Sequence, residues 1–231
     1  MAVVTVATTK GGVGKSTTVT NLAVAAWADG YSVKVFDCDP QRHSQLILGL
    51  YKQALPEGTT AQRQALDVEA EATEADIVKK INVAAKDYDL VLIDLQGSAN
   101  QIMLLAFARS DLVIIPVQPS ALDIGGAVAA WSSVQSAAEI RNRDIATRIL
   151  FCRTPAAIQP KVLKETRARF TEKGLAVMRA EFVERAAFKA LTFSGEMPTD
   201  FAPASPAAEN IRAIYNEVLQ DLEAIMQGEP A

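Results

Sequence analysis

A glycine-rich run directly after an apolar stretch at residues 3–7 constrains the fold more than any other segment. The run reads Lys10-Gly11-Gly12-Val13-Gly14-Lys15-Ser16-Thr17. This pattern is typical of a phosphate-binding loop that leaves a buried strand and opens a helix. Its glycines let backbone N–H groups close around phosphates, while Lys15 serves the β and γ phosphates and the Ser16 hydroxyl serves Mg²⁺. We therefore expect all eight residues to bind a nucleoside triphosphate; the alternative is a glycine-rich turn without a ligand.

The head of this run departs from the ordinary pattern G-x-x-x-x-G-K-[ST]. Thr9 stands where that pattern has glycine, and an additional lysine, Lys10, follows it. This deviant form resembles the ParA/MinD family of cytoskeletal-like ATPases. The resemblance implies that Lys10 reaches across a nucleotide-sandwich dimer to the phosphates of the partner subunit. The alternative interpretation of Lys10 is an ordinary surface lysine.

Apolar runs alternate with helical segments along the chain, and 49% of the 231 residues are hydrophobic. The opening order of strand, helix and strand is the βαβ unit of a parallel sheet. We expect strands at residues 3–8, 32–37, 88–94, 112–117, 145–151 and 176–178, and helices at residues 15–29, 45–50, 74–85, 99–108, 122–140, 161–173 and 207–226. Residues 51–72 are hard to assign. The pattern predicts one α/β domain over residues 1–231, with a three-layer P-loop NTPase fold in which helices cover both faces of a mostly parallel central sheet.

Several classes of protein are disfavoured by composition. The chain has neither a basic N-terminal region with an apolar run nor an apolar segment of about 18 residues, which predicts a cytoplasmic protein without membrane association. Cys38 and Cys152 lie in strand-like surroundings, where a buried thiol is the default, and they suggest neither a disulfide scaffold nor a cluster site. His43 is the only histidine, so a histidine-rich metal centre is excluded.

Carboxylates at the ends of two expected strands complete the predicted site. Ligands of open parallel sheets bind beyond the carboxyl ends of the strands, where Asp37, Asp39 and Asp94 fall. Asp94 resembles a Walker-B aspartate that holds Mg²⁺ through water; its alternative is to cap the following helix. The segment Asp37-Cys38-Asp39-Pro40-Gln41 is similar to the D-x-D-P-Q segment of ParA proteins. That resemblance implies that Asp39 positions the attacking water, beside Lys10 and Lys15 as catalytic groups, and that Asp37 supports Mg²⁺.

Two further segments resemble the switch regions of this family. Gln96 and Gly97 follow Asp94 where many relatives have two prolines, and the glycine is similar to small, ParF-like partition ATPases. Asp123 lies in a segment, residues 116–123, in which the family's aspartate is close to the signature lysine. The alternative for Asp123 is a helix-opening acid in the first turn.

The rim that holds adenine is assigned by resemblance only. The resemblance points to the strand end at residues 152–154, which contains Arg153, and to the loop at residues 197–200, which contains Pro198. Backbone groups are expected to matter more than side chains at both places.

Charge is unevenly distributed along the chain, whose net charge is −4. Residues 141–189 carry twelve lysines and arginines against five acids, a net charge of +7. Such a strip binds DNA phosphates without reading the base sequence. The preferred contacts share one expected helix: Lys161, Lys164, Arg167, Arg169 and Lys173. The alternative is a solvated helix face paired with Glu165 and Glu172.

The resemblance as a whole implies a slow, partner-stimulated ATPase with ATP and Mg²⁺ as cofactors. It implies an ATP-dependent homodimer, nonspecific DNA of the nucleoid as a matrix, and a ParB-like activator or cargo adaptor. No helix-turn-helix domain is expected before the loop. One alternative is a MinD-like membrane regulator, although the acidic segment 209–226 would be repelled by anionic lipid. Another is a dethiobiotin-synthetase-like ATP-dependent ligase.

Overall fold

The computed structural model describes residues 1–59, 63–70, 73–97, 101–156 and 161–228. Within these residues seven strands form one sheet in the order β3-β2-β4-β1-β5-β6-β7, and every pairing is parallel. The strands are β1 (Ala2–Val6), β2 (Val33–Cys38), β3 (Leu66–Ala70), β4 (Leu90–Leu95), β5 (Leu112–Val117), β6 (Ala146–Thr154) and β7 (Phe182–Val183). The predicted parallel sheet is confirmed.

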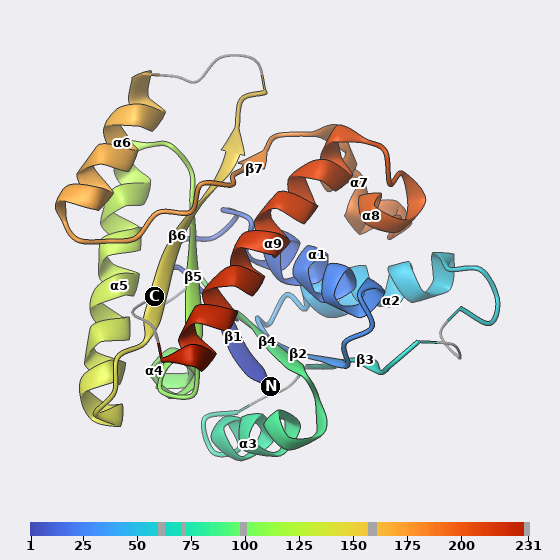
Figure 1. Ribbon diagram of the computed structural model, residues 1–231, viewed down its shortest axis with the longest axis horizontal. Helices are drawn as coiled ribbons and strands as arrows, with labels where there is room; N and C mark the ends of the chain where they lie inside the picture. The colour runs from blue at the N-terminus through green and yellow to red at the C-terminus, as the bar shows by residue number, and fades with distance from the viewer. Residues whose placement is uncertain (60–62, 71–72, 98–100, 157–160, 229–231) are drawn as a thin grey trace.

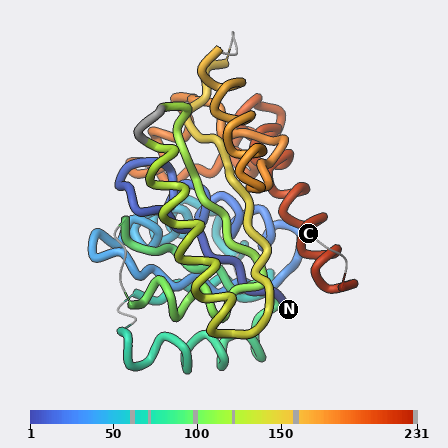
Figure 2. Tube along the Cα trace, turned by 90° about the vertical axis from the view of Figure 1, so that its left-hand side faces the viewer, coloured from blue at the N-terminus to red at the C-terminus, as the bar shows by residue number. Residues whose placement is uncertain are grey.

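Helices cover both faces of this sheet (Figure 1). One face packs α1 (Lys15–Ala28), α2 (His43–Ala54), α7 (Ala186–Ser194), α8 (Pro198–Phe201) and α9 (Pro206–Gln227). The other packs α3 (Ile77–Asp87), α4 (Gln101–Phe107), α5 (Ala121–Arg141) and α6 (Lys161–Glu172). Figure 2 shows α5 running along the side of the molecule with α6 beside it. The three-layer α/β fold is therefore as predicted.

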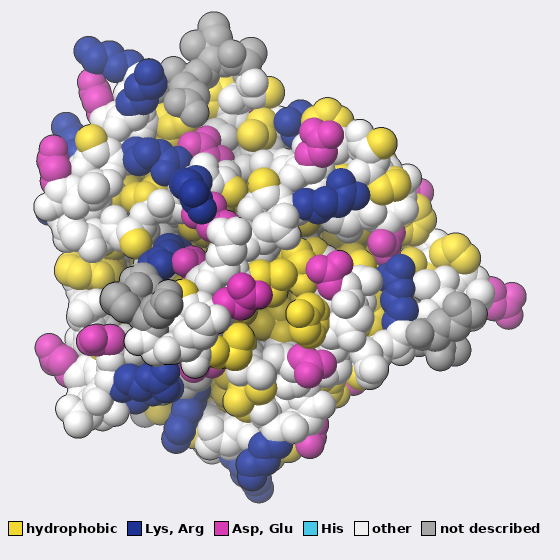
Figure 3. All heavy atoms as spheres, viewed as in Figure 1, with side chains coloured by type: hydrophobic (Ala, Val, Ile, Leu, Met, Phe, Trp, Pro, Cys, Tyr) yellow, Lys and Arg dark blue, Asp and Glu magenta, His cyan; other side chains and the backbone are white. Residues whose placement is uncertain are grey.

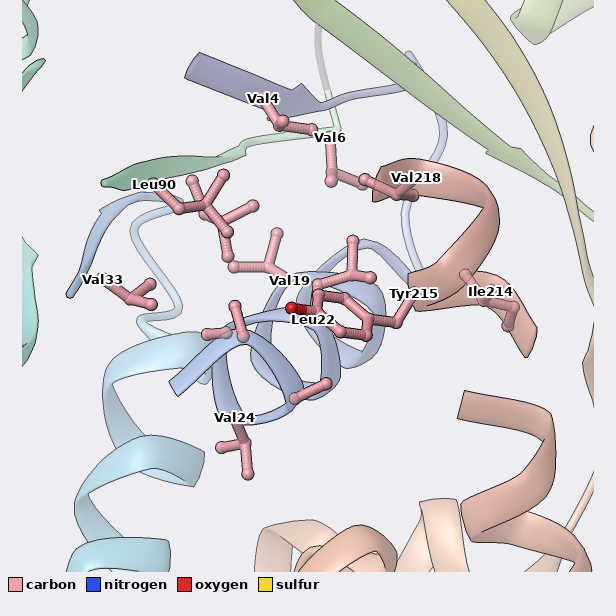
Figure 4. Close-up of a cluster of buried hydrophobic side chains, with 14 of the residues drawn as sticks. Val4, Val6, Val19, Leu22, Val24, Val33, Leu90, Ile214, Tyr215 and Val218 are labelled. Atoms are coloured by element: carbon pink, nitrogen blue, oxygen red, sulfur yellow. The ribbon is translucent and has the colours of Figure 1, made fainter. Parts of the chain in front are cut away.

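The central strands are hydrophobic on both sides because both faces are covered. β4 and β5 are buried at every position, and the β1 side chains divide between the two cores. Val4 and Val6 point toward α1 and α9, where Val19, Leu22 and Val218 meet them (Figure 4). A continuous apolar run is what a strand buried on both faces requires.

The edge strand after β6 differs from the prediction. Within residues 176–178 only Val177 pairs, in an isolated bridge with Ile149. The backbone N–H groups of Arg179 and Ala180 then donate to the Glu217 carboxylate of α9, at 2.8 and 2.9 Å. These two N–H groups therefore bond to α9 and not to β6, and pairing with β6 resumes only at β7.

Candidate functional site

The phosphate loop lies between β1 and α1 at the carboxyl end of the sheet. Gly12 and Gly14 have φ values of +73° and +111°, a conformation that side chains rarely adopt. The Lys15 ammonium donates to the Lys10 carbonyl oxygen at 3.3 Å, so this lysine lies along the loop. Burial lowers the pKa of Lys15, and the charges of Asp94 and Asp39 oppose that shift.

Asp37 and Asp94 stand opposite each other in the register of β2 and β4. Asp37 accepts hydrogen bonds from the backbone N–H groups of Gln45 and Asp39, at 2.9 and 3.2 Å. Asp94 accepts from the Ser44 hydroxyl at 2.7 Å. Burial raises the pKa of Asp94 to about 7, although the nearby Ser16 and Ser44 hydroxyls oppose the rise, and it also raises the pKa of Asp37.

These groups fit a magnesium ion that is bound together with a nucleotide. The Oδ1 atom of Asp94 is buried and has no hydrogen-bond partner among the described residues, which is unusual for a carboxylate oxygen. The described residues hold no cluster of three or more acids, histidines or cysteines that would cage a metal alone. Mg²⁺ in nucleotide sites is held by one or two carboxylates with phosphate oxygens and water. Ser16, Asp94 and Asp37 are suited to such a shared site.

The first two turns of α5 and the segment just before it contact the phosphate loop at three points. The Lys10 ammonium lies 2.5 Å from the Asp123 carboxylate, whose side chain is 3% exposed. The Gln118 side chain donates to the Gly12 carbonyl oxygen, and the Thr9 hydroxyl donates to the Gly126 carbonyl oxygen, each at 3.3 Å. Asp123 also lies in the first turn of α5, where its backbone N–H donates to the hydroxyl of the N-cap residue Ser120 at 3.2 Å. Asp123 therefore both contacts Lys10 and lies in the first turn of α5, the two positions that the sequence left as alternatives. The contact of Gln118 with the loop was not predicted.

The segment after Asp94 approaches the same loop from another strand. A Cβ atom placed on Gly97 would lie 3.0 Å from the Gly11 nitrogen and from the Lys10 carbonyl carbon and oxygen. A Cβ atom at this distance would push the backbone of one segment away by a few tenths of an ångström, so this position favours glycine. Gln96, which directly precedes Gly97, is half-buried. Asp39, after the end of β2, is also half-buried, and its carboxylate accepts a hydrogen bond from the Gln41 N–H at 2.9 Å.

A cavity of about 280 Å³ adjoins the phosphate loop. Among the residues that the structure describes, its lining comprises Gly14, Thr17, Cys152, Arg153, Phe182, Val183, Glu184, Arg185, Phe188, Lys189 and Thr192. Phe182 and Phe188 stack edge to face, and Glu184 pairs with Lys189 at 2.7 Å. The predicted Arg153 is at this cavity, with φ of +55°.

Pro198 and the rest of the loop at residues 197–200 are not in that lining. Pro198 instead opens α8, and Asp200 of the same helix accepts from the Tyr51 hydroxyl and from Arg63. Residues of β7 and α7, and not this loop, line the cavity together with Arg153. These elements carry little sequence signal, because β7 has two residues and α7 is held mainly by contacts with α2.

The basic residues of α6, and Lys173 directly after it, fall into two groups. Arg167 donates to the Glu181 carboxylate at 2.6 Å and to the Met178 carbonyl oxygen at 2.7 Å, and its guanidinium lies 5.2 Å from the centre of the Phe151 ring. Lys164, Arg169 and Lys173 are exposed, and Lys161 lies 3.6 Å from Glu165. Figure 3 shows lysine and arginine side chains over α6, at the upper left of this face. The Arg167 side chain is thus engaged in contacts within the fold, whereas Lys164, Arg169 and Lys173 are exposed.

The chain is similar to one described protein family and to several known proteins. The profile of the family described as "VirC1 protein" matches residues 1–226. "Protein ParA" of Rhizobium radiobacter is 32% identical over 226 residues, which cover 96% of this chain and 98% of that protein. "Chromosome-partitioning ATPase Soj" of Thermus thermophilus is 28% identical and covers 94% of each chain. Apo McdA of Cyanothece superposes with a TM-score of 0.77 at 17% identity, covering 94% of this chain and 99% of that one, a likeness of fold.

Proposed function

Because the chain belongs to the VirC1 family and is a ParA/MinD-type partition ATPase, we propose that it is an ATP-dependent dimerising switch. In its ATP state the switch binds DNA nonspecifically and positions a plasmid, a chromosome region or a protein cargo. Hydrolysis is slow until a ParB-like partner or cargo adaptor stimulates it. The observation that carries this proposal is the position of Lys10, at the mouth of a complete phosphate loop.

At the nucleotide, the loop amides and Lys15 would bind the phosphates, and Ser16, Asp94 and Asp37 would hold Mg²⁺. The metal supplies charge neutralisation for phosphoryl transfer. Asp39 is half-buried at the carboxyl end of β2, where it orients the attacking water. The base would enter the cavity beside the loop, whose lining includes Arg153, Phe182 and Phe188.

Lys10 supplies the connection between hydrolysis and assembly. Its side chain is 46% exposed although its ammonium is paired with a buried carboxylate, so it is available to a second subunit that faces the loop. An amine delivered in trans stabilises charge that develops on the transferred phosphoryl group, as an arginine finger does. Hydrolysis would then require the dimer.

The exposed cations of α6 are our candidates for the DNA contact. Lys161, Lys164, Arg169 and Lys173 lie on or directly after one helix, and each neutralised phosphate releases counterions, so binding weakens steeply with salt. The protein would accordingly be located in the cytoplasm, associated with the nucleoid. Among the helices within the described residues, none combines the length and apolar character needed to cross a bilayer.

Sedimentation with a non-hydrolysable ATP analogue and Mg²⁺ tests the proposal. We expect a dimer with the analogue and a smaller species with ADP. Lys15→Ala should abolish nucleotide binding, and Asp39→Ala should accumulate the dimer in ATP because hydrolysis is blocked. Random duplex DNA should bind only with the analogue, and a single species in all nucleotide states would contradict the switch.

A further inference from the structure

An apolar groove lies between α1 and α9, at the end of the sheet where the central strands β1 and β4 begin. Its volume is about 160 Å³. The floor is formed by core residues that remain open to this side, among them Leu22, Leu90 and Leu222 (Figure 4 shows the first two). Figure 3 shows the groove as hydrophobic side chains gathered in a hollow near the middle of that face, with acidic side chains around it.

The lip of the groove consists of large apolar side chains that face solvent. Met1 is 59% exposed, Tyr31 43% and Met226 63%, and Leu219 is half-buried beside them. Flexible methionines at the edge of an apolar surface adapt to different occupants. An engineered cavity of about 150 Å³ holds one benzene molecule. The groove therefore has room for one large apolar side chain.

The charged side chains of the groove are acidic, and the α-amino group of Met1 is a cation near Asp89. Asp89 and Glu223 are the charged side chains of its described lining, which contains no lysine or arginine. Asp29 lies beside the hydroxyl of Tyr215, another lining residue. An occupant that brings basic side chains next to its apolar anchor gains from these carboxylates, and an acidic occupant is repelled.

We propose that this groove docks a basic amphipathic segment of a protein partner, with one large apolar side chain inserted between α1 and α9 and flanking lysines or arginines at Asp29, Asp89 and Glu223. The groove is at the amino ends of β1 and β4, whereas the phosphate loop and Asp94 are at the carboxyl ends. The segment therefore binds without touching the nucleotide site or α6. The assignment does not depend on dimerisation or on DNA binding.

Fluorescence anisotropy with the labelled synthetic peptide GKRAWLKRG, on the full chain at low salt, tests the proposal. We expect saturable binding that is lost when tryptophan and leucine of the peptide are replaced by serine, and when its basic residues are replaced by glutamate. Glu223→Lys should weaken binding about ten-fold. Leu219→Glu should weaken it by more than about ten-fold, because it places a charge in the apolar wall.

Glu209→Lys is the matched control, since Glu209 is an exposed acid of the same helix outside the groove. It should leave peptide binding unchanged, and unchanged ATP-analogue binding by all variants would show that they are folded. Absence of saturable binding to the wild type, or equal effects of Glu209→Lys and Glu223→Lys, would overturn the proposal. So would loss of self-association or of anionic-vesicle binding in Leu219→Glu with peptide binding retained, because the occupant would then be a second copy or a lipid surface.

Discussion

The ammonium of Lys10 and the carboxylate of Asp123, 2.5 Å apart, join the head of the phosphate loop to the first turn of α5. The two partners are unequally exposed, at 46% and 3%. Lys10 must leave this carboxylate if it is to reach the phosphates of a second subunit. The ion pair therefore competes with the dimer that we propose, and the competition can be measured from both sides.

Asp123→Asn removes the charge that holds Lys10 and keeps an oxygen for the Ser120 hydroxyl. A partly exposed ion pair contributes on the order of 1 kcal/mol, so we expect dimerisation with the ATP analogue at roughly three- to ten-fold lower protein concentration. Sedimentation equilibrium measures the shift. Glu139→Gln, which neutralises an exposed acid of the same helix, serves as the control. Weaker dimerisation of Asp123→Asn would indicate that the ion pair supports the dimer instead.

Lys10→Ala tests the other partner. Lys15 and the loop amides remain, so we expect nucleotide affinity within about two-fold of the wild type. Stimulated hydrolysis should be lost, because the trans amine is missing from the transition state alone. Steady-state turnover with DNA and an activating partner, compared with nucleotide binding by fluorescence, separates the two effects. Normal stimulated turnover would count against a role in trans.

Gly97→Ala probes the contact between the segment after β4 and the phosphate loop. The added Cβ would meet backbone atoms of Lys10 and Gly11 at 3.0 Å, and backbone has little freedom to give way. We expect at least about ten-fold weaker ATP binding with only a modest loss of stability. Gly125→Ala is the control, because a Cβ there meets nothing within 4 Å. Equal ATP affinities of the two variants would contradict the proposed contact.

The burial of Asp94 predicts a dependence of stability on pH. Its pKa is about 7 in the folded chain against an ordinary 3.8, so between these values the folded state binds a proton that the unfolded state has released. The stability of the ligand-free protein therefore falls as pH rises from about 4 to about 7. Asp94→Asn removes this loss, and its gain over the wild type should be roughly 1–3 kcal/mol larger at pH 8 than at pH 5. Urea unfolding at the two pH values measures it; an equal difference at both would refute the assignment.

The parts of the site that were predictable from sequence are those built within one strand and the residues after it. The run from Lys10 to Thr17 contains its own glycines, and an aspartate at the end of an apolar run must reach the carboxyl edge of a parallel sheet. Asp37 and Asp94 are therefore neighbours whichever helices cover them. The parallel sheet and the two helical layers follow from the same alternation, whereas the spatial order of the strands was not predicted and β3 lies in the segment that was left unassigned.

Apart from Arg153, the cavity that we propose for the base was not predictable in this way, because distant segments form it. β7 is two residues long, and α7 ends at Gly195, where a Cβ would lie 2.4 Å from the backbone of Leu50 and Tyr51. A glycine that is needed because another helix approaches closely produces no periodic pattern of hydrophobic residues in the sequence around it. Gln118 is similar: it acts through one hydrogen bond to Gly12, 106 residues earlier.

Arg167 and its neighbours on α6 separate a structural role from the proposed DNA contact. Arg167 binds Glu181, Met178 and the face of Phe151, so Arg167→Ala should lower the free energy of unfolding by about 1–2 kcal/mol. Lys164 and Arg169 are exposed, and their joint reversal to glutamate should leave that free energy within about 0.5 kcal/mol of the wild type. The same double variant should weaken binding to random DNA at low salt and reduce its salt dependence, without changing ATP affinity. Chemical denaturation and DNA titrations at several salt concentrations measure both quantities. DNA binding that the double variant retains in full, at an unchanged salt slope, would move the DNA contact away from α6.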